Sequence, residues 1–199
     1  MSTKLNSATV QHILQANKVW KKVKQSRGSL KYGSMHKPLK LVAHCDASYT
    51  NLKDGSSQGG MIIFLVDSKG RASPISWTSK KLRRVSTSTI AAETMSLLDT
   101  IDACMWLSHY SKWADRWNAK NPRNIHWQHV VDRSSSLVHS TKAVEEKQLR
   151  VDIAAVRESI KHKEIIVQWI DNKGQLADVF TKQGANSQVL LDVMKYGQI

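Results

Sequence analysis

The chain has 199 residues, with 30 Lys or Arg against 16 Asp or Glu, a net charge of +14 and a pI near 9.9. This excess of positive charge favours a polyanionic partner, most simply nucleic acid, with an anionic membrane surface as the alternative. We expect neither a membrane-spanning nor a secreted protein, because no apolar run approaches about 18 residues and no signal-peptide core is present. Cys45 and Cys104 are isolated, which favours an intracellular, reducing setting.

The first 40 residues are the most basic part of the chain, with nine Lys or Arg and no Asp or Glu. Apolar residues recur at roughly helical spacing over residues 9–25, which predicts a basic amphipathic helix. Gly28, Gly33 and Pro38 then mark a linker. We interpret residues 1–39 as a helical tether from a preceding region of a longer polyprotein. Binding of nucleic acid by this segment is expected as a secondary effect.

The rest of the chain shows alternating strand and helix patterns. Strands are predicted at residues 40–47, 59–67, 72–80, 125–132 and 164–171, and the short loops between the first three indicate an antiparallel meander. Helices are predicted at 86–113, 135–140, 142–162, 174–182 and near 189–196, with Ser88 or Thr89 capping the first. This order predicts a mixed α/β or α+β domain over residues 40–183 and a C-terminal tail over 184–199.

Two of the predicted strands end on an acid, Asp46 in the first and Asp132 in the fourth. A crossover helix separates these strands, so they can run parallel and bring both carboxylates to one edge of the sheet. Glu93 and Asp178 add two carboxylates from the neighbouring helices. Such acids repel each other unless cations neutralise them, and magnesium prefers oxygen ligands. For Asp46 alone, the alternative is a strand-end residue that caps a turn.

Five segments in this order carry a resemblance to a known family: CDAS, STSTIAAET, VVDRSS, HSTKAVEEKQLRVDI and QLADVFTK. Over about residues 40–183, they resemble the ribonuclease H domain of copia-type retrotransposon Pol polyproteins. The resemblance implies a ribonuclease H-like α/β fold with a mixed sheet of five strands. In it the fourth and fifth strands would run parallel to the first, with helices on both faces.

The resemblance also implies a function. The catalytic set would be Asp46, Glu93, Asp132 and Asp178, which would bind two Mg²⁺ ions, with Mn²⁺ as a substitute. The protein would be a two-metal endonuclease that hydrolyses the RNA strand of RNA/DNA hybrids during reverse transcription. Its partners would be that hybrid and the reverse transcriptase domain of the same polyprotein. We expect it in the cytoplasm, within a virus-like particle, with access to the nucleus.

Small residues are the first candidates for contact with the hybrid. Gly59, Gly60 and Ser88 would allow close approach to a minor groove in which 2′-hydroxyl groups distinguish RNA from DNA. We also expect Arg133 and Lys142 to contact the nucleic acid.

His139 has two interpretations. It is either a mobile residue for proton transfer or product release, as in related enzymes, or an exposed polar side chain.

One departure from the family keeps a second function open. Arg133 stands beside Asp132, where the family usually has Asn, and a cation there either contacts phosphate or weakens metal binding. The alternative is a degenerate or co-opted ribonuclease H-like module that binds nucleic acid or protein without cutting. The ADVFTK ending argues against an integrase-like or transposase-like member of the same broad fold.

Other acids are interpreted as structural. Asp99 and Asp102 share a predicted helix with Glu93 but are rotated from it by about 240° and 180°, so we expect them in solvent. Asp152, on the helix predicted at 142–162, is expected to stay on the polar face of that helix.

Overall fold

The computed structural model describes residues 9–25, 30, 32–117, 125–131, 146–171 and 173–199, with only the backbone described over 111–131. Its contacts divide the chain into two compact units, Met1–Lys31 and Tyr32–Ile199. The predicted Asp132, Arg133, His139 and Lys142 lie outside the described residues, as does the helix predicted at 135–140.

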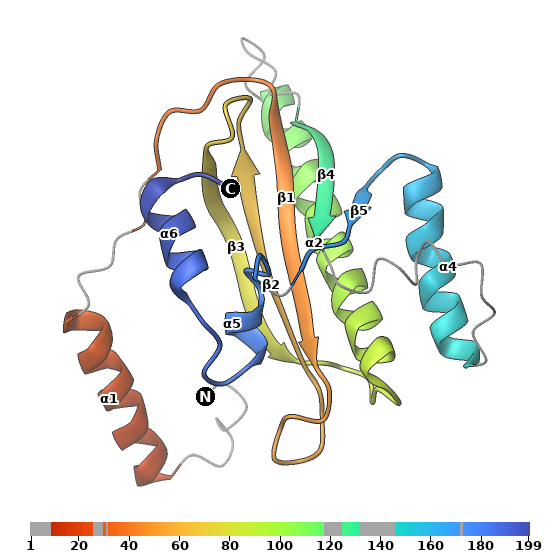
Figure 1. Cartoon of the computed structure of the whole chain (residues 1–199). Coiled ribbons are helices and arrows are strands. Elements are labelled where there is room, and N and C mark those ends of the chain that lie inside the picture. Colours follow the sequence, from red (N-terminus) through yellow and green to blue (C-terminus); the bar gives the residue numbers. More distant parts are fainter. Residues whose placement is uncertain (1–8, 26–29, 31, 118–124, 132–145, 172) are drawn as a thin grey trace. The chain divides into compact units, whose positions relative to one another are not determined.

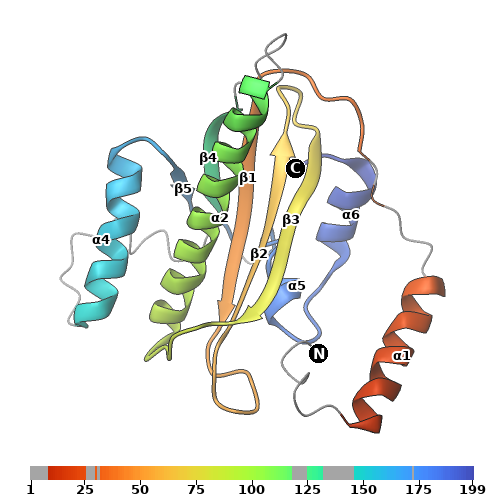
Figure 2. The same cartoon turned by 180° about the vertical axis from the view of Figure 1, so that it is seen from behind.

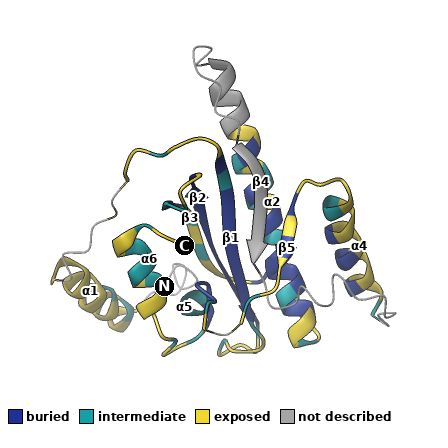
Figure 3. Cartoon of the chain, turned by 45° about the horizontal axis from the view of Figure 1, so that its top comes forward, coloured by how far each residue is buried: buried dark blue, intermediate teal, exposed yellow. Residues whose placement is uncertain are grey.

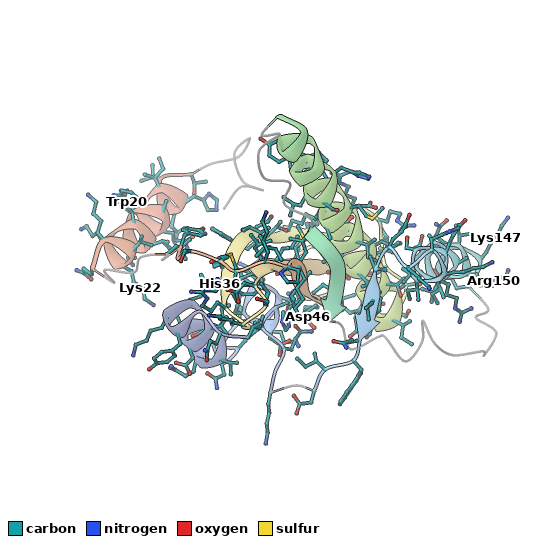
Figure 4. All side chains as sticks on the ribbon, turned by 90° about the horizontal axis from the view of Figure 1, so that it is seen from above. Trp20, Lys22, His36, Asp46, Lys147 and Arg150 are labelled. Atoms are coloured by element: carbon teal, nitrogen blue, oxygen red, sulfur yellow. The ribbon has the colours of Figure 1, made fainter. Side chains whose placement is uncertain are left out.

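The first unit contains the helix α1 (Val10–Gln25), close to the prediction. None of its residues is buried. Its six large apolar side chains are all more than half exposed: Val10, Ile13, Leu14, Val19, Trp20 and Val23. Lys24 places its ammonium 5.3 Å from the centroid of the ring of Trp20, which is labelled in Figure 4. The amphipathic helix is therefore formed, and its large apolar side chains are exposed to solvent.

The second unit is built on a sheet of five strands in the order β3-β2-β1-β4-β5 (Figure 1). The strands β1 (Leu39–Ser48), β2 (Gln58–Val66) and β3 (Ala72–Lys81) form the predicted antiparallel meander, which is confirmed. The strand β4 (Ile125–Val131) pairs parallel with β1, and β5 (Ile166–Gln168) pairs parallel with β4. The sheet is thus mixed, with β1 at its centre.

The strand predicted at 164–171 is too long, since β5 pairs with β4 only over Ile166–Gln168. The apolar pattern of this segment continues past β5, into residues that do not pair with β4. Ile170 leaves the sheet and packs on a buried cluster that contains Leu176. The apolar run therefore spans the short strand β5 and the first residues of the segment that connects it to α5.

Helices cover both faces of the sheet (Figures 1 and 2). One face carries α2 (Thr89–Trp117) and α4 (Lys147–Lys161), and the other carries α5 (Asp178–Thr181) and α6 (Gln188–Tyr196). Strand β1 is buried along most of its length because both layers cover it (Figure 3). Its side chains alternate between the layers: Leu41, Ala43 and Cys45 face α2 and α4, whereas Val42 joins the cluster under α5 and α6.

Local signals explain where α2 begins and why α5 is short. The Ser88 hydroxyl accepts a hydrogen bond of 3.1 Å from the N–H of Ala91, so the predicted N-cap is confirmed. The helix predicted at 174–182 is wrong in extent, since only Asp178–Thr181 is helical. Before it, Gln175 accepts a hydrogen bond from the Ala177 N–H, and this side chain holds the preceding residues in a turn.

The acids interpreted as structural behave differently from one another. Asp102 is exposed, and Asp99 pairs with Lys80 at 2.9 Å on the surface. The prediction for Asp152 is wrong, because its residue is only 7% exposed and it pairs with Arg84 at 2.8 Å. The loop that precedes α2 supplies Arg84 and covers this side of α4, which helical periodicity alone does not reveal.

The segments on either side of the predicted domain also contact the sheet. The Tyr32 hydroxyl donates to the Pro74 carbonyl at 3.0 Å, and the Ala72 N–H donates to the Gly197 carbonyl at 2.7 Å. Leu190, Val193 and Met194 of α6 pack on the buried cluster. These contacts place Tyr32–Ile199 in one compact unit, whereas the functional boundaries at residues 39 and 183 stay predictions.

Asp67 fixes the turn between β2 and β3. Its carboxylate accepts hydrogen bonds from the backbone N–H groups of His36, Lys69 and Arg71 at 3.0, 2.8 and 2.9 Å. The Arg71 side chain adds an ion pair of 2.8 Å. Burial by itself would raise the pKa of Asp67, but these donors outweigh it and hold the pKa well below the usual value. The carboxylate thereby joins the incoming chain at His36 to the meander.

The first prediction concerns Asp67 and acid. Asp67→Asn should lower the melting temperature at about pH 7, because an amide cannot replace the ion pair with Arg71. The folded pKa lies below the unfolded value of about 3.9, so the wild type keeps this contribution above that value and loses it as the pH falls further. The difference in melting temperature between the two proteins should therefore shrink towards about pH 3.

Circular dichroism melts across this pH range measure the effect, with Asp99→Asn as the control for a partly exposed ion pair. A difference between Asp67→Asn and the wild type that does not change with pH would contradict the account.

Candidate active site

Asp46 is a buried carboxylate two residues before the end of β1. Its residue is 2% exposed, and it lies opposite the face occupied by its neighbour Cys45, so it faces α5 (Figure 4). The Thr181 hydroxyl donates a hydrogen bond to Oδ2, and Nζ of Lys182 lies 3.4 Å from the same oxygen. Burial of a charged carboxylate is costly unless it is paired, and the C-terminal end of α5 supplies these two partners among the described residues.

Asp178 opens α5 and lies one helical turn before Lys182. The Lys182 ammonium is 2.9 Å from Oδ1 of Asp178, so one cation is shared by Asp178 and Asp46. The side chain of Asp178 is 19% exposed, whereas that of Asp46 is 2% exposed. The arrangement therefore has a buried side and a solvent side, and it is centred on a positive charge.

Glu93 belongs to α2, in the helical layer on the opposite face of the sheet from α5. The Ser96 hydroxyl, one turn further along α2, donates to the backbone carbonyl of Asp46 at 2.8 Å. Residues three apart are neighbours on a helix surface, so the half-buried Glu93 lies on the side of α2 that meets this strand end.

The meander holds the short helix α5 in place. The Phe180 carbonyl accepts hydrogen bonds from Gln58 at 2.9 Å and Ser79 at 2.6 Å, and the Thr181 carbonyl accepts one from Asn51 at 3.0 Å. The last carbonyls of a helix have no partner inside the helix, and here the β1–β2 loop, β2 and β3 supply partners. The position of Asp178 and Lys182 is thus set by three separate parts of the chain.

His44 lies two residues before Asp46 on the same face of β1. Burial lowers its pKa to about 4, and a side-chain hydrogen bond with Gln175 only partly opposes this shift. Its ring meets Phe64 edge-on, with the centroids 6.4 Å apart. Neutral at about pH 7, His44 contributes no positive charge beside Asp46, which leaves Lys182 as the cation that compensates this carboxylate among the described residues.

Gly59 and Gly60 are both buried, and packing explains their small size. A Cβ atom at Gly59 would lie 2.7 Å from Leu82 Cδ2, and one at Gly60 would lie 2.6 Å from Phe180 Cβ and 2.8 Å from Thr181 Cγ2. Their faces are therefore covered by α5 on one side and by residues before and in α2 on the other. Contact of their backbone with nucleic acid stays a prediction.

The structure brings together part of the predicted site. Asp46 and Asp178 share a cation, Glu93 lies on the adjoining helix, and Asp132 is outside the described residues. Within the described part of the chain, no group of three or more His, Cys, Asp or Glu side chains is arranged to hold a metal ion. Sequence reasoning assigned no role to Lys182, although its spacing of four residues from Asp178 on a helix is a usable signal.

A cavity of about 550 Å³ adjoins these residues between α5 and α6. Asp178, Lys182 and Lys173 contribute its charged lining, and Leu176 and Leu190 are among its apolar residues. The Lys182 side chain, 35% exposed, thus stands between the buried Asp46 and open space.

No model of a protein family matches the chain, and no curated protein matches it. Ribonuclease H1 from the halophilic archaeon Halobacterium salinarum NRC-1 is similar in structure, with 13% identity and a TM-score of 0.48 over 77% of this chain and 98% of that one. LC11 ribonuclease H1 in complex with an RNA/DNA hybrid shows 14% identity and a TM-score of 0.45, over 71% and 93% of the two chains.

The ribonuclease H domain of prototype foamy virus shows 17% identity and a TM-score of 0.41, over 75% of this chain and 96% of that domain. The copia-type assignment stays a prediction. Among the helices that the structure describes, none has the length and apolarity to cross a bilayer.

The second prediction tests the contact between β2 and α5. Gly60→Ala should destabilise the protein by about 1–3 kcal/mol, because the added Cβ overlaps Phe180 and Thr181 and forces α5 away from Asp46. Gly33→Ala is the matched control, since a Cβ there meets nothing within 4 Å. Denaturant unfolding measures both variants. Equal unfolding free energies for the two would show that α5 does not pack against Gly60.

Proposed function

We propose that the protein is a reverse transcriptase-associated ribonuclease H that hydrolyses the RNA strand of RNA/DNA hybrids with the aid of divalent metal. The observation that carries this proposal is Asp46, a buried carboxylate near the end of the central strand that shares one cation with Asp178. A residue that only caps a local turn would have no reason to share a cation with a second acid from a segment more than 130 residues later. The copia-type resemblance adds the expected substrate.

The residues present suit a magnesium site. Asp46 and Asp178 offer hard oxygen donors that already share a positive charge, and with Glu93 and Asp132 they would hold the ions. Bound metal in such a site supplies an activated water and stabilises the leaving oxygen of the cleaved phosphodiester.

Other residues of the chain hold the proposed metal-binding carboxylates in position. Thr181 fixes the orientation of the Asp46 carboxylate, and the meander fixes Asp178 through the carbonyls of α5. Preorganised ligands need no rearrangement when substrate binds, which is how a short helix of four residues can serve a catalytic site.

The net charge of +14 supports a hybrid as the partner, because contacts to phosphate release counterions regardless of sequence. Lys147 and Arg150 are exposed on α4 and point outward from it (Figure 4). In the proposal, Arg133 and Lys142 contact phosphates and His139 assists proton transfer or product release. The reverse transcriptase domain of the same polyprotein is the proposed protein partner.

A second candidate is a ribonuclease H-like module that binds nucleic acid without cutting it. Lys182 favours this alternative, because an ammonium that already offsets part of the negative charge of Asp46 and Asp178 reduces the need for metal. Arg133, in place of the family's usual Asn, would add to the effect.

The third prediction separates the two candidates. The wild type should cleave a labelled RNA/DNA hybrid with Mg²⁺ and leave double-stranded RNA intact. Asp46→Asn should reduce the rate by more than about 100-fold, because it removes a charged ligand at the centre of the site. Asp99→Asn is the matched control, since it removes a partly exposed carboxylate of α2 that pairs with Lys80.

Cleavage gels with and without EDTA give the measurement. Tight hybrid binding without cleavage, in either Mg²⁺ or Mn²⁺, would favour the non-cutting module. Cleavage gained by Arg133→Asn would then assign the loss to that residue.

A further inference from the structure

Lys182 forms ion pairs with Asp46 and Asp178, and these are two of the carboxylates that bind metal in the proposed function. Its ammonium is 2.9 Å from Asp178 and 3.4 Å from Asp46, and both contacts go to carboxylate oxygens. The Asp46 oxygen that it approaches, Oδ2, is also the oxygen that accepts the Thr181 hydrogen bond. A divalent cation at these carboxylates would meet the same ammonium.

The balance of charge explains why Lys182 is there. Two carboxylates in one place repel each other, and Asp46 is buried, so an uncompensated negative pair would destabilise the fold. One ammonium shared between them reduces both costs. Lys182 is a compact charge on a flexible stem of four carbons, and its side chain is 35% exposed. It can therefore move to solvent without disturbing the backbone of α5.

Thr181 makes that movement tolerable. Its hydroxyl donates to Asp46 independently of Lys182, and its carbonyl is held by Asn51. Asp46 thus keeps Thr181 as a fixed partner when the ammonium leaves. The adjoining cavity between α5 and α6 gives the displaced side chain open space on the solvent side.

We propose that Lys182 is a built-in counter-ion that competes with divalent cations for Asp46 and Asp178 and so sets the metal affinity of the site. The inference rests on the proposed function in one respect, that these carboxylates bind metal. It makes Lys182 a regulator of metal occupancy: the fold is stabilised by the ammonium at low metal concentration and by the divalent cation at high concentration.

The matched pair of variants is Lys182→Met and Lys173→Met. Both remove one positive charge from the lining of the same cavity. Among the described residues, the ion pairs to Asp46 and Asp178 come from Lys182 and not from Lys173. Lys182→Gln provides a second variant without the charge if Lys182→Met does not fold.

Calorimetric titration with Mg²⁺ and Mn²⁺, together with thermal melts in EDTA and in metal, tests the proposal on the full chain. Lys182→Met should tighten the Kd by about 3- to 10-fold relative to the wild type, as expected for loss of a partly exposed competing ion pair. It should also lower the melting temperature in EDTA and show a larger rise on adding metal. Lys173→Met should change the Kd by less than Lys182→Met.

The outcomes separate this inference from the proposed function. An unchanged or weaker Kd in Lys182→Met, or an equal tightening in both lysine variants, overturns the competition and leaves the nuclease proposal standing. Metal binding that survives Asp46→Asn in every variant overturns both. Tighter binding in Lys182→Met without hybrid cleavage by any variant supports the competition and rejects the nuclease.

Discussion

Burial of the Asp46 carboxylate is the constraint on which the site depends. A charge at this depth must be compensated, and the compensation comes from Thr181 and Lys182 at the end of α5. Because α5 has only four residues, it cannot hold its own position by helical hydrogen bonding. The meander therefore has to fix it, through Gln58 and Ser79 on the Phe180 carbonyl.

The two layers of helices meet at this strand end from opposite faces. From one layer, Ser96 of α2 binds the Asp46 backbone, while the Asp46 side chain turns to α5 in the other layer. Gly60 lets α5 approach the sheet closely enough for this contact, since any larger residue would overlap Phe180. Asp46 is therefore held from both faces of the sheet, through its backbone carbonyl on one face and its carboxylate on the other.

Lys182 links the stability of this arrangement with its chemistry. An ammonium shared between Asp178 and Asp46 stabilises a pair of acids that would otherwise repel each other. The same contact opposes any cation that would use those oxygens. The Lys182 side chain therefore raises the stability of the fold without metal and lowers the affinity of the site for metal.

Elements defined by local patterns were predictable. The three strands of the meander and the cap at Ser88 follow from alternation, turn residues and hydrogen bonding within a few residues. Predictions failed where distant segments decided the outcome. Ile170 extended an apparent strand but packs beside Leu176, and Asp152 looked solvent-facing until Arg84 reached it from the loop before α2.

The sequence by itself determined the order of strands and helices and the presence of acids at strand and helix ends, because periodicity and capping act over a few residues. It also contained the four-residue spacing of Asp178 and Lys182. Only the tertiary structure decided that Lys182 reaches Asp46, since the two residues are far apart in the chain and meet through packing of α5 on the sheet. Contacts of this kind depend on which face of the sheet each element covers, and no local pattern encodes that choice.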